Sequence, residues 1–193
     1  MVSRLSGDNG CVSDPSPDHT SEKDDLRAEL LQLRRNRTLE EIEAARAAVR
    51  SAVLARHQIE RWATVAAYRP LRSEPGSPEL LAELVGRGVR VLVPVTLPDN
   101  ELDWVALPGD EPLTVDAIAT ADAVLVPALA VGPDGTRLGR GGGSYDRALT
   151  RARPGTTVAA LLYDGELVAH VPRDGWDKPV TAHVTPALGW VDL

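Results

Sequence analysis

The sequence predicts an α/β protein built in three layers, with a mainly parallel sheet, helices on both faces and further helices at the N-terminal end. Three observations predict this class. Segments with the apolar spacing of helices alternate along the chain with short apolar runs. These runs are apolar throughout, as in strands that are buried on both faces of a sheet. A length of 193 residues is enough for one domain with a substantial core.

Capping residues and apolar spacing predict two N-terminal helices. Ordered structure is expected to begin near Ser21, a candidate N-cap, and a leucine stripe over residues 26–33 follows it. The residues TLEE then form a capping box between Thr38 and Glu41. This box is expected to open a second helix, whose apolar side continues as far as Val53.

The remaining elements are predicted from turn residues and apolar runs. Ser77 is a candidate N-cap followed by proline, and Gly88 is expected to end the helix that begins there. A further helix is expected over about residues 144–151. Buried strands are predicted at five apolar runs, namely TVAAY (64–68), VRVLVPV (89–95), AVLVPALAV (123–131), TVAALLY (157–163) and VTAHVTP (180–186).

The composition excludes several classes of function. A formal net charge of -7 argues against binding nucleic acid through a broad basic surface. Cys11 is the only cysteine and has no disulfide partner in the chain, which fits a reducing compartment. No apolar run resembles a membrane span or a secretory signal. We therefore predict a cytoplasmic protein with no nucleic acid, membrane or obligate protein partner, a disordered tail (residues 1–21) and one α/β domain (residues 22–193).

A dense glycine stretch, RLGRGGGSYDR (137–147), follows a predicted strand and precedes a predicted helix. Ligands of open α/β sheets bind at the carboxyl edge of the strands, where such a loop is expected to lie. Glycines allow phosphate oxygens to approach the backbone closely, and Arg137 and Arg140 would neutralise phosphate charge. The stretch alone therefore fits either a phosphate site or a tight structural turn.

Three known glycine motifs do not match this stretch. A Walker loop requires a lysine, which the stretch lacks. The dinucleotide pattern G-x-G-x-x-G begins at Gly139 and Gly141 but has Ser144 at its third position, and the G-x-S-x-G pattern around Ser144 ends on Asp146. Asp146 lies in the first helical turn, where its carboxylate could reach a metal ion.

Three segments together resemble the 5-formyltetrahydrofolate cyclo-ligase family, also called 5,10-methenyltetrahydrofolate synthetase. They are KDDLR (23–27), LVPALAVGPDGTRLGRGGGSYDRAL (125–149) and VPRDGWDKPVTAHVTP (171–186). The resemblance implies a Rossmann-like α/β fold and a reaction that depends on ATP and magnesium. In that reaction ATP phosphorylates the formyl oxygen of 5-formyltetrahydrofolate, N10 attacks the formyl carbon, and 5,10-methenyltetrahydrofolate, ADP and phosphate result.

The resemblance also assigns roles to residues of this chain. Lys23 and Arg140 are expected to be catalytic, and Glu74, Arg140 and Ser144 to contact the folate. Asp146 and Asp177 are expected to hold magnesium, because this hard cation prefers carboxylate oxygen. The residues expected to bind ATP are Lys23, Arg27, Arg137, Leu138, Gly139, Arg140, Gly141, Gly142, Gly143, Ser144 and Tyr145. On this basis Asp146→Asn is expected to lower turnover by orders of magnitude while the melting temperature barely moves.

The chain departs from the family pattern at a few positions. Ser144 stands where the family has the first of two aromatics, and Val131-Gly132 replaces the usual Phe-Asp. The chain has no phenylalanine, so Tyr68, Trp104 and Trp176 are candidates to line the pterin pocket. These departures leave two alternatives to the active cyclo-ligase: a folate- or nucleotide-binding protein without turnover, and an α/β hydrolase that uses Ser144 as its nucleophile.

Overall fold

The computed structural model describes residues 17–193. The predictions for residues 1–16, including Cys11, lie outside this range. Helix α1 (Pro17–Arg35) begins four residues before Ser21, so the predicted boundary between tail and domain falls inside a helix. An N-cap serine followed by an acid three residues later marks a helix start only when the preceding residues do not continue the helix.

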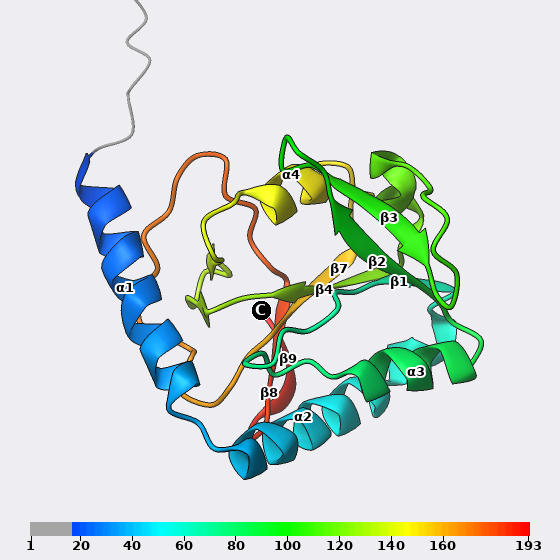
Figure 1. Ribbon diagram of the computed structural model, residues 1–193, viewed down its shortest axis with the longest axis horizontal. Helices are drawn as coiled ribbons and strands as arrows, with labels where there is room; N and C mark the ends of the chain where they lie inside the picture. Colours follow the sequence, from blue (N-terminus) through cyan, green and yellow to red (C-terminus); the bar gives the residue numbers. More distant parts are fainter. Residues whose placement is uncertain (1–16) are drawn as a thin grey trace, which may run out of the picture.

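One seven-stranded sheet forms the centre of the protein, in the order β3-β2-β1-β4-β7-β8-β9 (Figure 1). The strands are β1 (Thr64–Ala66), β2 (Arg90–Thr96), β3 (Leu102–Ala106), β4 (Ala123–Pro127), β7 (Thr157–Leu161), β8 (Ala182–Thr185) and β9 (Gly189–Asp192). The five inner strands run parallel, and the edge strands β3 and β9 pair antiparallel with their neighbours. At the centre, Val65 of β1 is in register with Val91 of β2 and Ala123 of β4. The mainly parallel α/β fold is confirmed.

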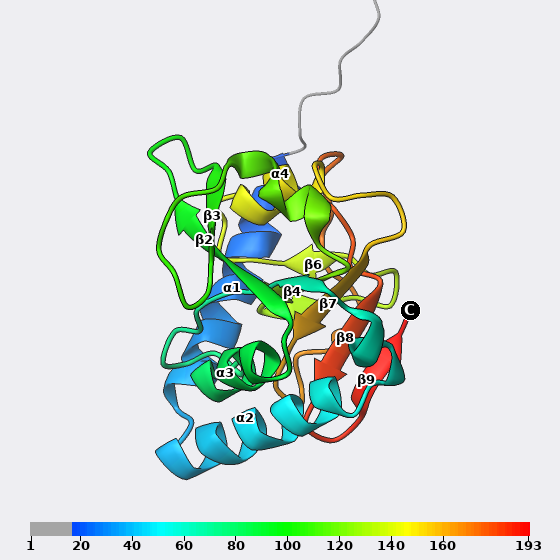
Figure 2. The same cartoon turned by 90° about the vertical axis from the view of Figure 1, so that its right-hand side faces the viewer.

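The helices α2 (Leu39–Leu54) and α3 (Pro78–Gly86) cover one face of the sheet (Figure 2). Val49, Val53 and Leu84 have no exposed surface and pack in one cluster with apolar residues of the central strands. A short 3₁₀ helix, η1 (His57–Arg61), connects α2 to β1. The apolar stripe predicted for the second helix therefore faces the sheet, as expected for an amphipathic helix.

The opposite face is covered by the 3₁₀ helix η2 (Val115–Thr120) and by α4 (Ser144–Leu149). Ile118 and Ala148 pack there against a second apolar cluster, which also contains Trp104. Helices therefore lie on both faces, and the prediction of three layers is confirmed. Among residues 17–193, no helix combines the length and apolar character that crossing a membrane requires.

Two of the predicted N-caps, Thr38 and Ser77, form as expected. The Thr38 hydroxyl accepts a hydrogen bond from the Glu41 N–H at 3.2 Å, and the Thr38 N–H donates to the Glu41 carboxylate at 2.7 Å. The Ser77 hydroxyl caps α3 by accepting a hydrogen bond from the Leu80 N–H at 3.2 Å, and Gly88 lies just past the end of this helix with a φ of 81°. A positive φ at this position is reached easily only by a residue without a side chain.

The predicted strand over residues 123–131 divides into two. The chain leaves the sheet after Pro127 and forms a small antiparallel hairpin, β5 (Ala130–Val131) with β6 (Arg137–Leu138). Helix α1 lies beside this hairpin, at the side of the sheet rather than over either face (Figure 1). Leu30 is the buried residue of the α1 leucine stripe, whereas Leu33 is 52% exposed. The hairpin leads into the glycine stretch and places it beside α1.

His183 makes stability dependent on pH. Its side chain lies buried in β8, and burial lowers the pKa of the imidazole. The folded state therefore keeps the His183 imidazole neutral. The stabilisation from this neutral side chain is complete above the imidazole's pKa in the unfolded chain, about 6.5, and is lost as the pH falls below that value. We expect the Tm to fall between pH 7.5 and 5.5, and to fall less in His183→Gln. The exposed His57 serves as control, and equal slopes in wild type, His183→Gln and His57→Gln would contradict this assignment.

Candidate functional site

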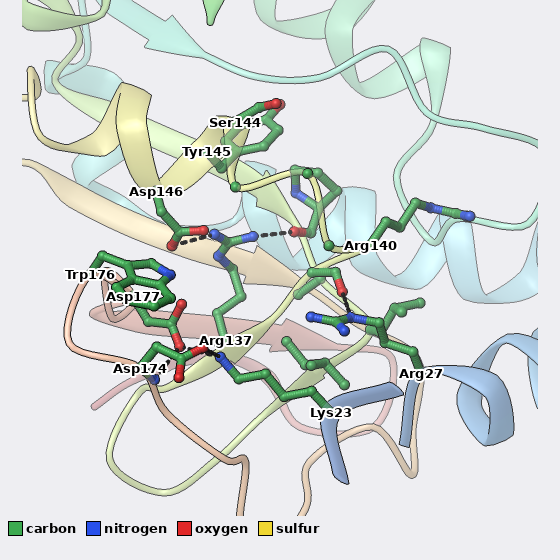
Figure 3. Close-up of a pocket in the computed structure, with 18 of the residues that line it drawn as sticks. Lys23, Arg27, Arg137, Arg140, Ser144, Tyr145, Asp146, Asp174, Trp176 and Asp177 are labelled. Atoms are coloured by element: carbon green, nitrogen blue, oxygen red, sulfur yellow. Dashed lines mark hydrogen bonds and ion pairs between the residues drawn. The ribbon is translucent and has the colours of Figure 1, made fainter. Parts of the chain in front are cut away.

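A cavity of about 650 Å³ lies between α1, the glycine stretch and the turn at residues 174–177 (Figure 3). Its volume is typical of a small-molecule site. The structure brings together all the residues that were expected to be catalytic or to bind ATP, folate or magnesium, because each of them lines this cavity. They are Lys23, Arg27, Glu74, Arg137, Leu138, Gly139, Arg140, Gly141, Gly142, Gly143, Ser144, Tyr145, Asp146 and Asp177.

Two glycines of the stretch are required by the backbone itself. Gly141 has a φ of 102° and Gly143, the N-cap of α4, has a φ of 65°. Side chains at these positions would be strained, so part of the stretch is a tight turn. Gly139 and Gly142 do not have positive φ values, and both line the cavity. The turn and the cavity wall are therefore formed by the same residues.

Lys23 is buried and paired with two acids across the cavity. Its Nζ lies 2.7 Å from Asp174 Oδ2 and 2.6 Å from Asp177 Oδ2 (Figure 3). Burial by itself lowers the pKa of Lys23, but the two carboxylates outweigh it and the net shift is upward. The Asp174 N–H donates to Asp177 Oδ2 at 2.8 Å, which fixes the turn. The predicted phosphate ligand Lys23 and the predicted metal ligand Asp177 are thus in direct contact.

Arg137 and Asp146 form the second such pair. Arg137 Nη2 donates to Asp146 Oδ1 at 3.0 Å, and the arginine side chain is only 4% exposed. The same guanidinium donates from Nη1 to the Pro127 carbonyl at 3.3 Å, at the end of β4. The Lys178 N–H donates to Asp146 Oδ1 at 3.1 Å. Asp146 therefore joins α4, the hairpin and the segment that precedes β8.

Arg27 and Arg140 differ in how firmly they are held. Arg27 Nε donates to the Gly139 carbonyl at 3.0 Å, which ties α1 to the glycine stretch. Arg140 is 43% exposed, and its Nε lies 3.4 Å from Glu74 Oε1. Glu74 itself is buried, and its Oε2 accepts a hydrogen bond from the Leu71 N–H at 2.8 Å. Of the cations predicted for the site, Arg140 is therefore the one with the most freedom to move toward a ligand.

The residues fit a magnesium ion held jointly with a phosphate. Asp146 and Asp177 each use one carboxylate oxygen in the contacts above and carry a second oxygen. Within the described part of the chain, no three His, Cys, Asp or Glu side chains cluster in a way that could hold a metal ion. Magnesium commonly takes one or two carboxylates together with substrate phosphates, so two acids suffice when the nucleotide supplies the remaining ligands.

The candidate aromatic residues lie in different places. Trp104 has no exposed surface and packs in the core, so it does not line the cavity. Tyr68 is also buried away from the cavity wall, and burial raises its pKa. Trp176 is 60% exposed and lines the cavity. Tyr145 lines it too, and the pKa of its buried hydroxyl is raised by burial.

Sequence reasoning missed several residues that line the cavity, among them Asp174 and Arg34, both of which form ion pairs. Asp174 pairs with Lys23, and the only signal for it was its position three residues before Asp177. Arg34 borders the cavity from α1, but a single arginine in a charged helix carries no signal of its own. No histidine is among the described residues that line the cavity, so Ser144 has no imidazole base there of the kind a serine nucleophile uses.

Comparison with known proteins identifies the family. The family model described as 5-formyltetrahydrofolate cyclo-ligase matches residues 19–186. The 5-formyltetrahydrofolate cyclo-ligase of Mycolicibacterium smegmatis is 42% identical over 149 residues, which is 67% of this chain and 77% of that protein. The protein of the same name from Escherichia coli is 31% identical over 145 residues, which is 66% of this chain and 80% of that protein.

Two solved structures are similar in fold. The 5,10-methenyltetrahydrofolate synthetase of Mycoplasma pneumoniae has a TM-score of 0.72 at 22% identity, covering 82% of this chain and 95% of that one. The 5,10-methenyltetrahydrofolate synthetase of Aquifex aeolicus has a TM-score of 0.70 at 25% identity, covering 85% of this chain and 89% of that one. By its sequence match and its fold, this chain belongs to the 5-formyltetrahydrofolate cyclo-ligase family.

Proposed function

We propose that this chain converts 5-formyltetrahydrofolate into 5,10-methenyltetrahydrofolate at the cavity between α1 and the glycine stretch, and that it consumes ATP. One observation supports this site above all others. In a member of the cyclo-ligase family, a single cavity is lined by a glycine stretch, by two aspartates able to share a cation with phosphate, and by the basic side chains of Lys23, Arg27, Arg137 and Arg140. Phosphoryl transfer depends mainly on positioning and on neutralising charge, and these are the groups that it requires.

The proposed chemistry begins with transfer of the terminal phosphoryl group of ATP to the formyl oxygen, which releases ADP. The nitrogen N10 then attacks the formyl carbon and loses its proton to solvent, the bond between that carbon and the phosphorylated oxygen breaks, and inorganic phosphate leaves. Arg140 is the residue we place between the two substrates, because it is partly exposed and its Nε lies 3.4 Å from Oε1 of the buried Glu74, the residue expected to contact the folate. From there its guanidinium can neutralise charge on the transferring group.

Lys23, Arg27 and Arg137 are proposed to hold the phosphates. Lys23 and Arg137 are paired with Asp177 and Asp146, respectively, so phosphate binding exchanges one anionic partner for another. This exchange frees the two carboxylates at the moment when the phosphates arrive. Asp146 and Asp177 would then hold magnesium, which supplies further neutralisation of phosphate charge when it is bound.

A single assay tests the proposed function. Purified protein is mixed with 5-formyltetrahydrofolate, ATP and magnesium, and the near-ultraviolet absorbance of the methenyl product is followed. We expect product to form only when ATP is present. Product formation in the absence of ATP, or no product from folded protein, would contradict the proposal.

A second candidate function is binding of folate or nucleotide without turnover. It is favoured by two departures from the family pattern: Ser144, which lines the cavity, and Val131-Gly132, which lies at the hairpin that leads into the glycine stretch. Tight binding of 5-formyltetrahydrofolate with no product in the same assay would support it. Location in the cytoplasm and the absence of nucleic-acid and obligate protein partners stay predictions from the composition.

A further inference from the structure

A buried ion pair lies at the C-terminal end of α1. Arg34 donates from Nε to Glu166 Oε1 and from Nη2 to Glu166 Oε2, both at 2.7 Å. Arg34 Nη2 also donates to the Ala128 carbonyl at 2.6 Å, and Glu166 Oε2 accepts from the Tyr163 N–H at 2.8 Å. The side chains of Arg34 and Glu166 are 1% and 4% exposed. Burial by itself lowers the pKa of Arg34, but Glu166 outweighs it and the net shift is upward.

This pair, called the α1 clamp below, connects three separate segments: the end of α1, the chain after β4 and the turn after β7. Helix α1 has fewer buried apolar residues than α2, because it lies at the side of the sheet (Figure 1). Leu30 is its buried leucine. One buried leucine restricts the angle of a helix less than a two-bond arginine–carboxylate fork, which has a fixed geometry. The clamp therefore sets the direction in which α1 leaves the sheet.

Two cations of the proposed nucleotide site lie on the same helix. With a rise of about 1.5 Å per residue, Arg27 and Lys23 lie about 10 Å and about 16 Å along α1 from Arg34. A tilt of about 5° at the clamp would move the Lys23 end by about 1.4 Å over that length. A misplacement of about 1 Å near reacting groups costs about a hundredfold in rate.

The contacts that tie these two cations to segments outside α1 are the ones that a ligand replaces. Lys23 is held by Asp174 and Asp177, and Arg27 contacts the Gly139 carbonyl of the glycine stretch, besides its ion pair with Asp24 within α1. When a phosphate binds to Lys23 or Arg27, the contact of that side chain with the rest of the protein is weakened or lost. The α1 clamp makes no contact with these groups, so it remains in place while the other ties change.

We propose that Arg34 and Glu166 are positioning residues, which hold α1 at the angle that places Lys23 and Arg27 on the nucleotide phosphates. The assignment of phosphates to these cations rests on the proposed function. A buried ion pair often adds little to stability compared with an apolar pair of similar volume. The clamp is therefore explained better by orientation than by stability, and the two roles can be separated by experiment.

The test compares the double variant Arg34→Met/Glu166→Met with wild type in nucleotide binding, folate binding and Tm. We expect the Tm to stay within several degrees of wild type, because an apolar pair fills the site. The Kd for ADP, measured by calorimetry, is expected to rise at least tenfold. The Kd for 5-formyltetrahydrofolate is expected to change less than twofold. A folded double variant that binds ADP as tightly as wild type would overturn the proposal.

A control removes a different ion pair, Arg56–Asp192, which lies away from the cavity. Arg56 Nη2 lies 3.0 Å from Asp192 Oδ1, and neither residue lines the cavity. The variant Arg56→Met/Asp192→Asn is expected to bind ADP as wild type does. If it weakens ADP binding to the same degree as the clamp variant, the effect is a general loss of rigidity and the proposal is wrong.

A second variant covers the case in which the double variant does not fold. Glu166→Gln keeps the shape of the side chain and removes its charge, and hydrogen exchange of the α1 amides is measured with and without ADP. We expect exchange over residues 23–34 to be faster than in wild type in both states. Unchanged exchange in both states would overturn the proposal.

Failure of the proposed function gives a different pattern from failure of the clamp. Wild type that binds ADP but makes no methenyl product would refute the proposed function and leave the clamp to be judged by the variants. Wild type that makes product, together with a folded clamp variant that binds ADP normally, would refute the clamp alone. Wild type that binds neither ADP nor ATP would refute both.

Discussion

Replacement of Arg140 by alanine is expected to lower kcat by about two to three orders of magnitude, the loss seen when one preorganised charge-stabilising group is removed. Folding stability is expected to change little. The side chain is 43% exposed and its contact with Glu74 is 3.4 Å long, so a partly solvated ion pair is all that is lost. The measurements are kcat at saturating ATP and folate, and the Tm of the same preparation.

Ser144 provides the matched control, because it lies four residues further along the same stretch and lines the same cavity. Ser144→Ala is expected to keep most of the activity. Ser144→Tyr, which restores the aromatic residue usual in the family, is expected to be tolerated and to tighten ligand binding severalfold at most, since ring stacking contributes about 1 kcal/mol. An inactive Ser144→Ala beside an active Arg140→Ala would contradict the account and favour a serine nucleophile.

Asp146→Asn is expected to lower turnover by orders of magnitude and also to lower stability. The loss of rate follows from the proposed metal role, because metal-assisted charge stabilisation is worth several kcal/mol in a transition state. The loss of stability follows from Arg137, which is 4% exposed and pairs with Asp146. Hydrogen bonds to charged groups contribute about 1.5–3 kcal/mol, so the Tm is expected to fall by several degrees.

The contact with Arg137 changes the expectation from the sequence, in which Asp146 was a metal ligand whose only structural role was that of an acid in the first turn of a helix. The measurements are kcat as a function of magnesium concentration and the Tm, with Asp116→Asn as control. Asp116 pairs with Arg151 and does not line the cavity. Wild-type rates for Asp146→Asn at saturating ATP and low magnesium would refute the metal assignment.

Much of the fold could be predicted because its signals are local. The Thr38–Glu41 capping box and the Ser77 cap each depend on residues within three positions of one another, and both form as predicted. The inner strands are buried on both faces, so their sequences are apolar throughout and easy to find. The edge strands β3 and β9 were not predicted, because edge strands are half-covered and their sequences mix polar and apolar residues.

The pairing of charges in the site could not be predicted from the sequence. Lys23 meets Asp174 and Asp177, which lie 151 and 154 residues further along the chain. Residue type indicated that the basic side chains could bind phosphate and the acidic ones a metal ion, and the family resemblance indicated that these residues share one site. Only the three-dimensional fold shows that the predicted phosphate ligands Lys23 and Arg137 are held by the predicted metal ligands Asp177 and Asp146.

The fate of the formyl oxygen tests the central claim most directly. If the cavity transfers the terminal phosphoryl group of ATP to that oxygen, the oxygen leaves the folate as part of inorganic phosphate. We therefore expect 5-formyltetrahydrofolate labelled with oxygen-18 in its formyl group to give one labelled oxygen in each phosphate released, measured by mass spectrometry. Phosphate free of the label, formed alongside the methenyl product, would contradict the account.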